Sequence, residues 1–297
     1  MKRDSLTSFT RHLVDCMKDS GRFRIAETYK TTLNSFNRFL GGKDISFELL
    51  STTLIGQYQV WLQEQGLSRN TTSFYMRNLR AIYNHAVEQG YAPEGNPFRL
   101  VYTGVDKTRK RALPLPMIRR IKGLDLSKRP DLALARDMFL FSFYTRGMSF
   151  IDMSYLRPEN LSGGYLYYCR KKTGQPIQIK WEKRMQDIVD RYQSAPTGYL
   201  LPIIVDPDRD ERNQYRNILF HVNSGLAEIS GILHIDPPVT TYVARHSWAT
   251  IAYAKEIPVS VISEALGHDS ERTTRIYLAS VSTTRVDKAN SKIIDLL

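Results

Sequence analysis

The spacing of apolar residues constrains this chain more than any other feature, because it follows a helical period almost throughout. In the first third, apolar side chains recur at intervals of three and four in residues 6–17, 26–40 and 71–90. Such spacing predicts amphipathic helices. Glycine readily adopts the left-handed conformation that ends a helix, and glycines follow the periodic segments. We therefore predict four helices, which end near these glycines: Gly21, Gly41 with Gly42, Gly66 and Gly90.

The region after these helices predicts a boundary between two domains. Ser68 and Thr71 are candidate N-cap residues for the last helix, because their hydroxyls can accept hydrogen bonds from its first turn. Residues 92–98, APEGNPF, are typical of an irregular connection, and the sequence GVDKTRKRALPL that follows is basic and ends among prolines. The predicted division is a helical domain (1–103), a basic linker (104–114) and a second domain (115–297) with a tail at about 282–297.

In the second domain, the spacing of apolar residues departs from the helical period in only one segment. Helical spacing predicts helices over 116–124 and 131–147, and again from residue 181 onward. Between them, Tyr165 and Tyr167 alternate with their neighbours, as do Ile177 and Ile179, around a turn that contains Gly174 and Pro176. This pattern is typical of a β-hairpin. The predicted fold is therefore mostly α, with a small hairpin or sheet in the second domain.

Charge and composition narrow the class of partner. The chain has 42 Lys and Arg against 30 Asp and Glu, a net charge of +12, which favours a polyanion such as nucleic acid. No run approaches the roughly 20 apolar residues that span a bilayer. Only Cys16 and Cys169 are present, without the paired spacing of a zinc site. We expect an intracellular, cytoplasmic protein with no membrane partner, no metal and no cofactor. The basic linker residues either are solvated or lie on DNA phosphates: Lys107, Arg109, Lys110 and Arg111.

Two segments of the last third resemble a known enzyme family. Residues 242–250 read YVARHSWAT, residues 265–270 read ALGHDS, and Tyr277 follows His268 by nine positions. This order resembles the tyrosine recombinases, also called phage integrases, in which HxxRH and LGH precede a tyrosine at that spacing. The sequence TRGMSFIDM at residues 145–153 resembles the corresponding segment of integrases from Bacteroides-type mobile elements and invertible DNA segments. The resemblance implies a helical SAM-like core-binding domain and an α+β catalytic domain.

The resemblance also implies a role for each site residue. Tyr277 would attack a DNA phosphate and become linked to its 3′ side, while Arg245 would stabilise charge on the phosphate oxygens. Lys172, in the hairpin turn, would protonate the leaving 5′-oxygen, with Lys171 as the rival candidate. His268 would donate a hydrogen bond to the phosphate. No metal ion or nucleotide is implied.

Two positions depart from the family pattern. The family usually has its first arginine in TGxRxSEL, and alignment of SEL with residues 151–153 leaves Ser149 at that position. Arg146 lies one helical turn earlier, and we assign it the role of the first arginine, with Ser149 as the alternative hydroxyl donor. Tyr242 stands where HxxR has histidine. It either contacts the phosphate or packs beside Trp248, whereas His246 is expected to support the helix.

The function implied is site-specific DNA recombination through a covalent 3′-phosphotyrosine, for a mobile element or an invertible DNA segment. The expected partners are double-stranded DNA and three further copies of the chain, in a tetramer on paired sites, with accessory DNA-bending proteins possible. Two alternatives stay open at this stage. One is a catalytically impaired DNA-binding protein on the same fold, and the other is an enzyme similar to type IB topoisomerases. The apolar tail after Tyr277 docks either on a neighbouring protomer or on its own core.

Overall fold

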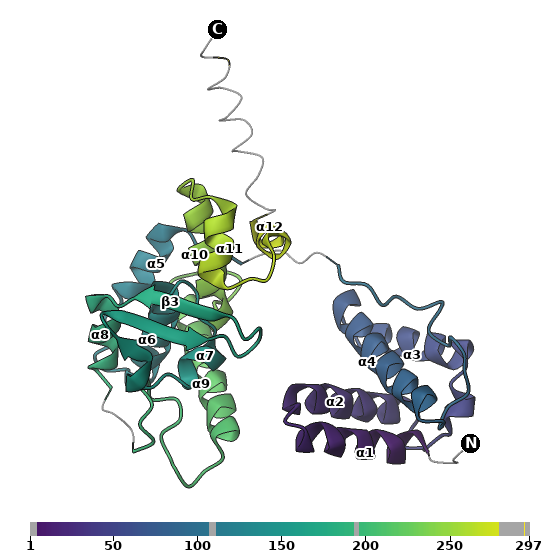
Figure 1. The fold of residues 1–297 in the computed structure, drawn as a ribbon. Helices are drawn as coiled ribbons and strands as arrows, with labels where there is room; N and C mark the ends of the chain where they lie inside the picture. Colours follow the sequence, from purple (N-terminus) through teal and green to yellow (C-terminus); the bar gives the residue numbers. More distant parts are fainter. Residues whose placement is uncertain (1–4, 107–110, 193–195, 279–293, 295–297) are drawn as a thin grey trace. The chain divides into compact units, whose positions relative to one another are not determined.

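A computed structural model describes residues 5–106, 111–192, 196–278 and 294, and it divides the chain into two compact units. Unit 1 is Met1–Thr108 and unit 2 is Arg109–Leu297. Figure 1 shows that unit 1 is helical and that unit 2 combines helices with one small sheet. The predicted fold class is confirmed. In the described part of the chain, no helix is both long and apolar enough to cross a membrane.

Unit 1 contains the four predicted helices. They are α1 (Leu6–Asp19), α2 (Phe23–Phe39), α3 (Thr52–Glu64) and α4 (Arg69–Glu88), with a 3₁₀ turn, η1 (Phe47–Leu49), before α3. Each predicted glycine follows its helix with a positive φ angle, as the left-handed end of a helix requires. Ser68 is the N-cap of α4 and accepts a hydrogen bond from Thr71 N, so Thr71 lies inside the helix.

An aromatic core holds the four helices together. Phe36 and Tyr58 are fully buried, with ring centroids 4.8 Å apart in an edge-to-face arrangement. The Tyr58 hydroxyl donates to Ser35 Oγ at 2.8 Å, which satisfies a polar group that would otherwise be buried without a partner. Burial raises the pKa of this phenol, so it stays protonated.

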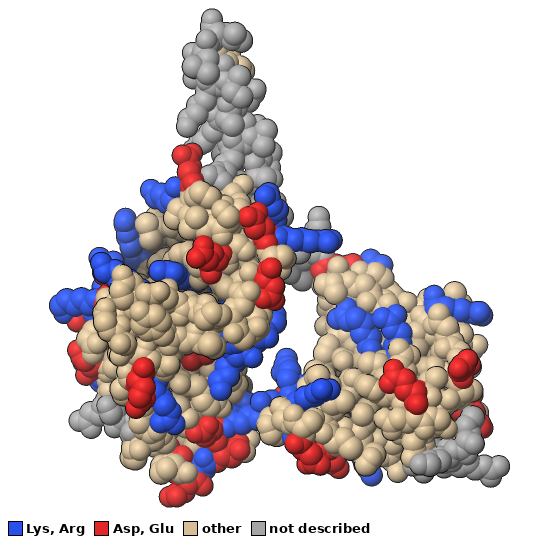
Figure 2. All heavy atoms as spheres, in the orientation of Figure 1, with Lys and Arg blue, Asp and Glu red and all other residues tan. Residues whose placement is uncertain are grey.

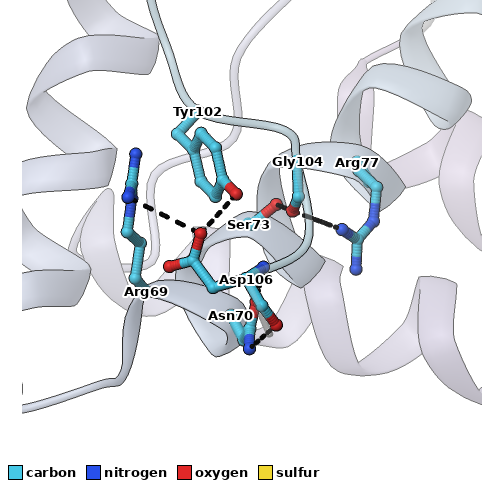
Figure 3. A network of polar contacts seen from close by, with 7 residues as sticks. All are labelled: Arg69, Asn70, Ser73, Arg77, Tyr102, Gly104 and Asp106. Atoms are coloured by element: carbon cyan, nitrogen blue, oxygen red, sulfur yellow. Dashed lines mark hydrogen bonds and ion pairs between the residues drawn. The ribbon is translucent and has the colours of Figure 1, made fainter. Parts of the chain in front are cut away.

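A polar network fixes the point at which the chain leaves unit 1 (Figure 3). Asn70 on α4 exchanges two hydrogen bonds with the backbone of Asp106, at 3.1 and 2.7 Å. Arg77 donates to the carbonyl of Gly104 at 2.8 Å, and Tyr102 donates to Asp106 Oδ1 at 2.6 Å. The first residues of the predicted linker are therefore bound to α4.

In unit 2, α6 (Pro130–Tyr144), which is apolar on nearly all sides, contacts α5 (Leu115–Lys122), α8 (Lys183–Val189), α9 (Glu211–Ile232) and α10 (Thr241–Ala254). Its buried side chains share one core with α9 and α10. At Gly225 on α9, an added Cβ would lie 2.8 Å from Ala135 Cβ, so glycine permits close packing of α9 on α6. The other helices of the unit are α7 (Phe150–Ser154), α11 (Val259–Leu266) and α12 (Glu271–Leu278).

The predicted hairpin is present, within a three-stranded antiparallel sheet of order β1-β2-β3. The hairpin consists of β2 (Tyr165–Cys169) and β3 (Pro176–Lys180). Leu166 pairs with Ile179 on the buried face, whereas Tyr165 and Tyr167 are on the exposed face. The sequence did not indicate β1 (Leu161–Ser162), which follows a 3₁₀ turn, η2 (Pro158–Asn160). Two residues are too few to show a period.

The chain is also bound where it enters unit 2. Leu113 N donates to Ser247 Oγ at 2.8 Å, and that hydroxyl donates to Val243 O at 2.8 Å within α10. Ser247 is buried. The basic segment thus lies between two anchored ends. Of its four cationic residues, Arg111 is described and exposed, and Lys107, Arg109 and Lys110 lie outside the described residues.

Candidate active site

The site forms around the loop that ends α11. Gly267 has a φ of 59°, the left-handed conformation that ends this helix, and His268 N donates to Ser263 O at 3.0 Å. An added Cβ at Gly267 would lie 2.7 Å from Arg170 Cδ, so only glycine allows this approach. The LGH loop, residues 266–268, therefore presents two backbone carbonyls and one imidazole to the same region.

Arg245 on α10 lies against this loop with 3% of its surface exposed. Its Nη1 donates to Gly147 O at 2.9 Å, and its Nη2 donates to Leu266 O. The same Nη2 lies 3.1 Å from His268 Nε2. Hydrogen bonds from a charged donor are each worth about 1.5–3 kcal/mol, so these contacts fix the guanidinium in one orientation.

Arg146 lies on the turn after α6, next to the glycine that Arg245 contacts. Its φ of 59° is in the left-handed region, which costs a non-glycine residue about 1–2 kcal/mol. Its Nη1 donates to Gln178 O of β3 at 3.3 Å. Strain of this kind is retained where the surrounding structure holds the residue in place. Gly147 follows with a φ of 78°, and an added Cβ there would lie 2.6 Å from Arg245 Cα.

The β2–β3 turn supplies three consecutive cations. Arg170 is 7% exposed and donates from Nη1 to Gly267 O. Lys171 Nζ lies 3.7 Å from the centre of the Tyr155 ring, a cation–π contact. Lys172 is exposed. The turn is tied to the loop after α11 by Gln175, whose side chain donates to Asp269 Oδ1 at 2.7 Å.

The pKa shifts of two groups agree with these contacts. Burial and then the charges of Arg245, Arg170 and Lys172 lower the pKa of His268 to about 4, so the ring is neutral at pH 7. Burial raises the pKa of the Tyr168 phenol, and the charges of Arg245, Arg170 and Arg146 oppose that rise. Arg245 and Arg170 act on both groups, Lys172 acts on His268 and Arg146 acts on Tyr168.

Asp152 connects the segment after Arg146 to the β2–β3 hairpin. This buried carboxylate accepts from Lys171 N at 2.8 Å and from Ser149 Oγ at 2.6 Å. Ser149 is the N-cap of α7, so its hydroxyl is engaged in holding the start of that helix. The sequence offered one signal for Asp152, an acidic residue at the position of the family's SEL motif.

The helix that carries Tyr277 packs on the helix that carries Arg245. Leu278 of α12 shares a buried cluster with Ala249 and Ala252 of α10. Thr274, one turn before Tyr277, is fully buried, and its Oγ1 lies 2.8 Å from His268 Nδ1. The backbone of Tyr277 is helical, and its side chain lies outside the described residues.

The two aromatic residues at the start of α10 pack on each other. Tyr242 is 49% exposed, and its ring lies edge-on to the His246 ring at 4.8 Å. Half of the Tyr242 surface faces solvent, and the two alternatives for this residue, a phosphate contact and packing beside Trp248, stay predictions. His246 is buried, in agreement with a supporting role.

Comparisons with known proteins agree with this architecture. The sequence profile of the phage integrase SAM-like domain matches residues 5–102, and that of the phage integrase family matches residues 169–283. The chain belongs to the phage integrase family. It is a tyrosine-type site-specific DNA recombinase.

Three proteins similar to this chain illustrate the relationship. Tyrosine recombinase XerD of Pseudomonas aeruginosa is 22% identical over 257 residues, 84% of this chain and 85% of XerD. A tyrosine recombinase of Pseudothermotoga lettingae is 23% identical over 296 residues, 96% of each chain. The solved lambda integrase tetramer bound to a Holliday junction has a TM-score of 0.67 and 16% identity, and it covers 93% of this chain and 78% of its own.

Sequence reasoning within this family missed three residues that the structure brings to the site: Arg170, Asp152 and Thr274. Arg170 stands in a run of three cations, in which the sequence gives no sign of which one is buried. Thr274 has an equally ordinary neighbour, Thr273, which is exposed. Among the described residues, no group of three or more His, Cys, Asp or Glu side chains is placed to hold a metal ion.

Proposed function

We propose that this recombinase cleaves DNA by attack of the Tyr277 oxygen on a phosphorus atom. The P–O5′ bond breaks, the DNA becomes linked through its 3′ phosphate to the tyrosine, and a 5′-hydroxyl leaves. Two contacts carry this proposal. Arg245 donates to Gly147 O, next to Arg146. Arg170, in the turn that holds Lys172, donates to Gly267 O. A phenol has a pKa near 10, so attack at neutral pH needs cations that stabilise the phenolate and the phosphorane oxygens.

The two arginines suit the phosphate, because a guanidinium stays protonated and can hold two oxygens at once. We assign Arg146 to the role of the first arginine. Ser149 is the weaker candidate, since its hydroxyl already donates to Asp152. Tyr242 is half exposed at the start of α10, on the helical face that also carries Arg245, and is assigned a hydrogen bond to a phosphate oxygen.

Lys172 is proposed as the general acid that protonates the leaving 5′-oxygen. Its charge reaches His268, whereas the ammonium of Lys171 lies over the Tyr155 ring. A 5′-thiol leaving group needs no protonation, so it should restore cleavage by Lys172→Ala. Lys171→Ala is the matched control and should cleave the ordinary substrate at close to the wild-type rate. If the thiol substrate leaves Lys172→Ala as slow as before, Lys172 is not the acid.

The proposal places the nucleophile in the same subunit as the arginines, because α12 packs on α10 of its own chain. A suicide DNA substrate tests both statements. Wild type should form a covalent protein–DNA adduct, and Tyr277→Phe should form none, whereas Tyr165→Phe on the exposed face of β2 is the control. A mixture of Tyr277→Phe with Arg245→Ala should stay inactive. Activity in that mixture would indicate cleavage between subunits.

The biological substrate is proposed to be a duplex DNA site of a mobile element or an invertible segment, recombined by a tetramer. The basic linker between the two anchored ends supports a DNA partner, as do the Lys and Arg side chains spread over both units in Figure 2. Exchange between two defined sites is the decisive assay. DNA binding without an adduct would instead support a catalytically impaired protein, and relaxation without exchange would support a topoisomerase.

A further inference from the structure

The hydrogen bonds around His268 have directions that can be deduced. Arg245 Nη2 lies 3.1 Å from Nε2, and Thr274 Oγ1 lies 2.8 Å from Nδ1. An arginine side chain has donors and no acceptor, so Nε2 receives this bond with its lone pair. A neutral imidazole carries one N–H, which must then be on Nδ1. The Nδ1–H therefore donates to Thr274 Oγ1.

The neutral state of the ring is secured by its surroundings. Half-burial and three nearby cations lower the pKa of His268 to about 4. A protonated ring would also place an Nε2–H against the guanidinium of Arg245. The geometry and the charges agree on one tautomer in the DNA-free protein.

We propose that Thr274 is a positioning residue whose Oγ1 accepts from the Nδ1–H of His268 and orients the ring, so that Nε2 accepts from Arg245. This role differs from the donor role toward phosphate that the family resemblance implies for His268. The side chains of His268 and Thr274 also connect Arg245 to α12. Thr274 lies on this helix, one turn before Tyr277. The catalytic consequence rests on the proposed function of Tyr277, whereas the tautomer does not.

The tautomer has a direct spectroscopic test. In a ¹⁵N-labelled full-length protein at pH 7, Nδ1 of His268 should resonate as a protonated nitrogen and Nε2 as an unprotonated one, with His268→Gln used for assignment. Thr274→Val removes the acceptor of Nδ1–H and should weaken this preference, whereas Thr274→Ser should keep it. A wild-type signal from an Nε2–H tautomer or from a doubly protonated ring overturns the proposal, whatever the catalytic results.

Cleavage kinetics test the positioning role. Thr274→Val preserves side-chain shape and should slow adduct formation, by up to about 100-fold if Arg245 shifts by about 1 Å, with DNA affinity unchanged. Thr274→Ser should restore most of the rate. Thr273→Val is the matched control, because Thr273 is an exposed neighbour on the same helix. Wild-type cleavage by Thr274→Val, or failure of serine to rescue it, overturns the positioning role. An adduct formed by Tyr277→Phe would instead refute the proposed nucleophile and leave the tautomer intact.

Discussion

Substitution of Gly147 by alanine tests how tightly the turn at Arg146 and Gly147 packs on α10. Alanine at a φ of 78° costs about 1–2 kcal/mol, because L-residues disfavour the left-handed region. The new methyl would also lie 2.6 Å from Arg245 Cα and 2.8 Å from its Cβ. Relief of such overpacking costs a further 1–3 kcal/mol, about 2–5 kcal/mol in total. Gly147 O would also move, and with it the hydrogen bond that it accepts from Arg245.

Gly164→Ala isolates the conformational part of this cost. Gly164 has a φ of 79° in the same unit, and nothing lies within 4 Å of an added Cβ. The two variants should therefore differ by about 2 kcal/mol, which corresponds to a difference of about 4–8 °C in melting temperature for a unit of this size. Calorimetry measures the difference, and the suicide substrate should show slow cleavage by Gly147→Ala alone. Equal melting temperatures would refute the close contact between the turn and α10.

Three further outcomes follow from the structure. Asn70→Ala removes two hydrogen bonds to Asp106 and should destabilise unit 1 by about 2 kcal/mol in denaturant titration; an unchanged midpoint contradicts the linker anchor. The pKa of His268 is about 4 in the folded protein and about 6.5 when unfolded, so stability should fall as pH drops between these values. Melting curves of His268→Gln should lack that part of the pH dependence. DNA affinity should fall steeply with salt, and each linker cation that contacts phosphate should contribute about 0.9 to the log–log slope, measured with alanine variants of Lys107, Arg109, Lys110 and Arg111.

The helices of unit 1 and the hairpin of unit 2 were predictable because their signals are local. Each helix combines a period of three to four with a glycine that accepts a positive φ. The hairpin combines alternation with a turn at residues 170–175. Strand β1 was missed, since a two-residue strand forms only because β2 is there to pair with it.

The sequence predicted which residues belong to the site, but it did not predict the contacts between them. Spacing and motif order pointed to Arg245, His268 and Tyr277, but gave no indication that the carbonyls of the LGH loop hold two arginines. Which cation of the hairpin turn is buried depends on Gly267 and on the loop after α11, about one hundred residues away. A local sequence pattern cannot predict a contact between segments so far apart in the chain.

The sequence by itself determined the helical period, the positions where helices end, the net positive charge and the order of the reactive residues. These properties depend on composition, on residue order or on neighbours a few positions apart, so they can be deduced without the tertiary structure. Only the tertiary structure decided that Arg170 faces inward, that Asp152 receives the hairpin backbone and that His268 lies between Arg245 and Thr274. The physical reason is that burial, hydrogen-bond direction and pKa are set by groups brought together in space, far apart along the chain.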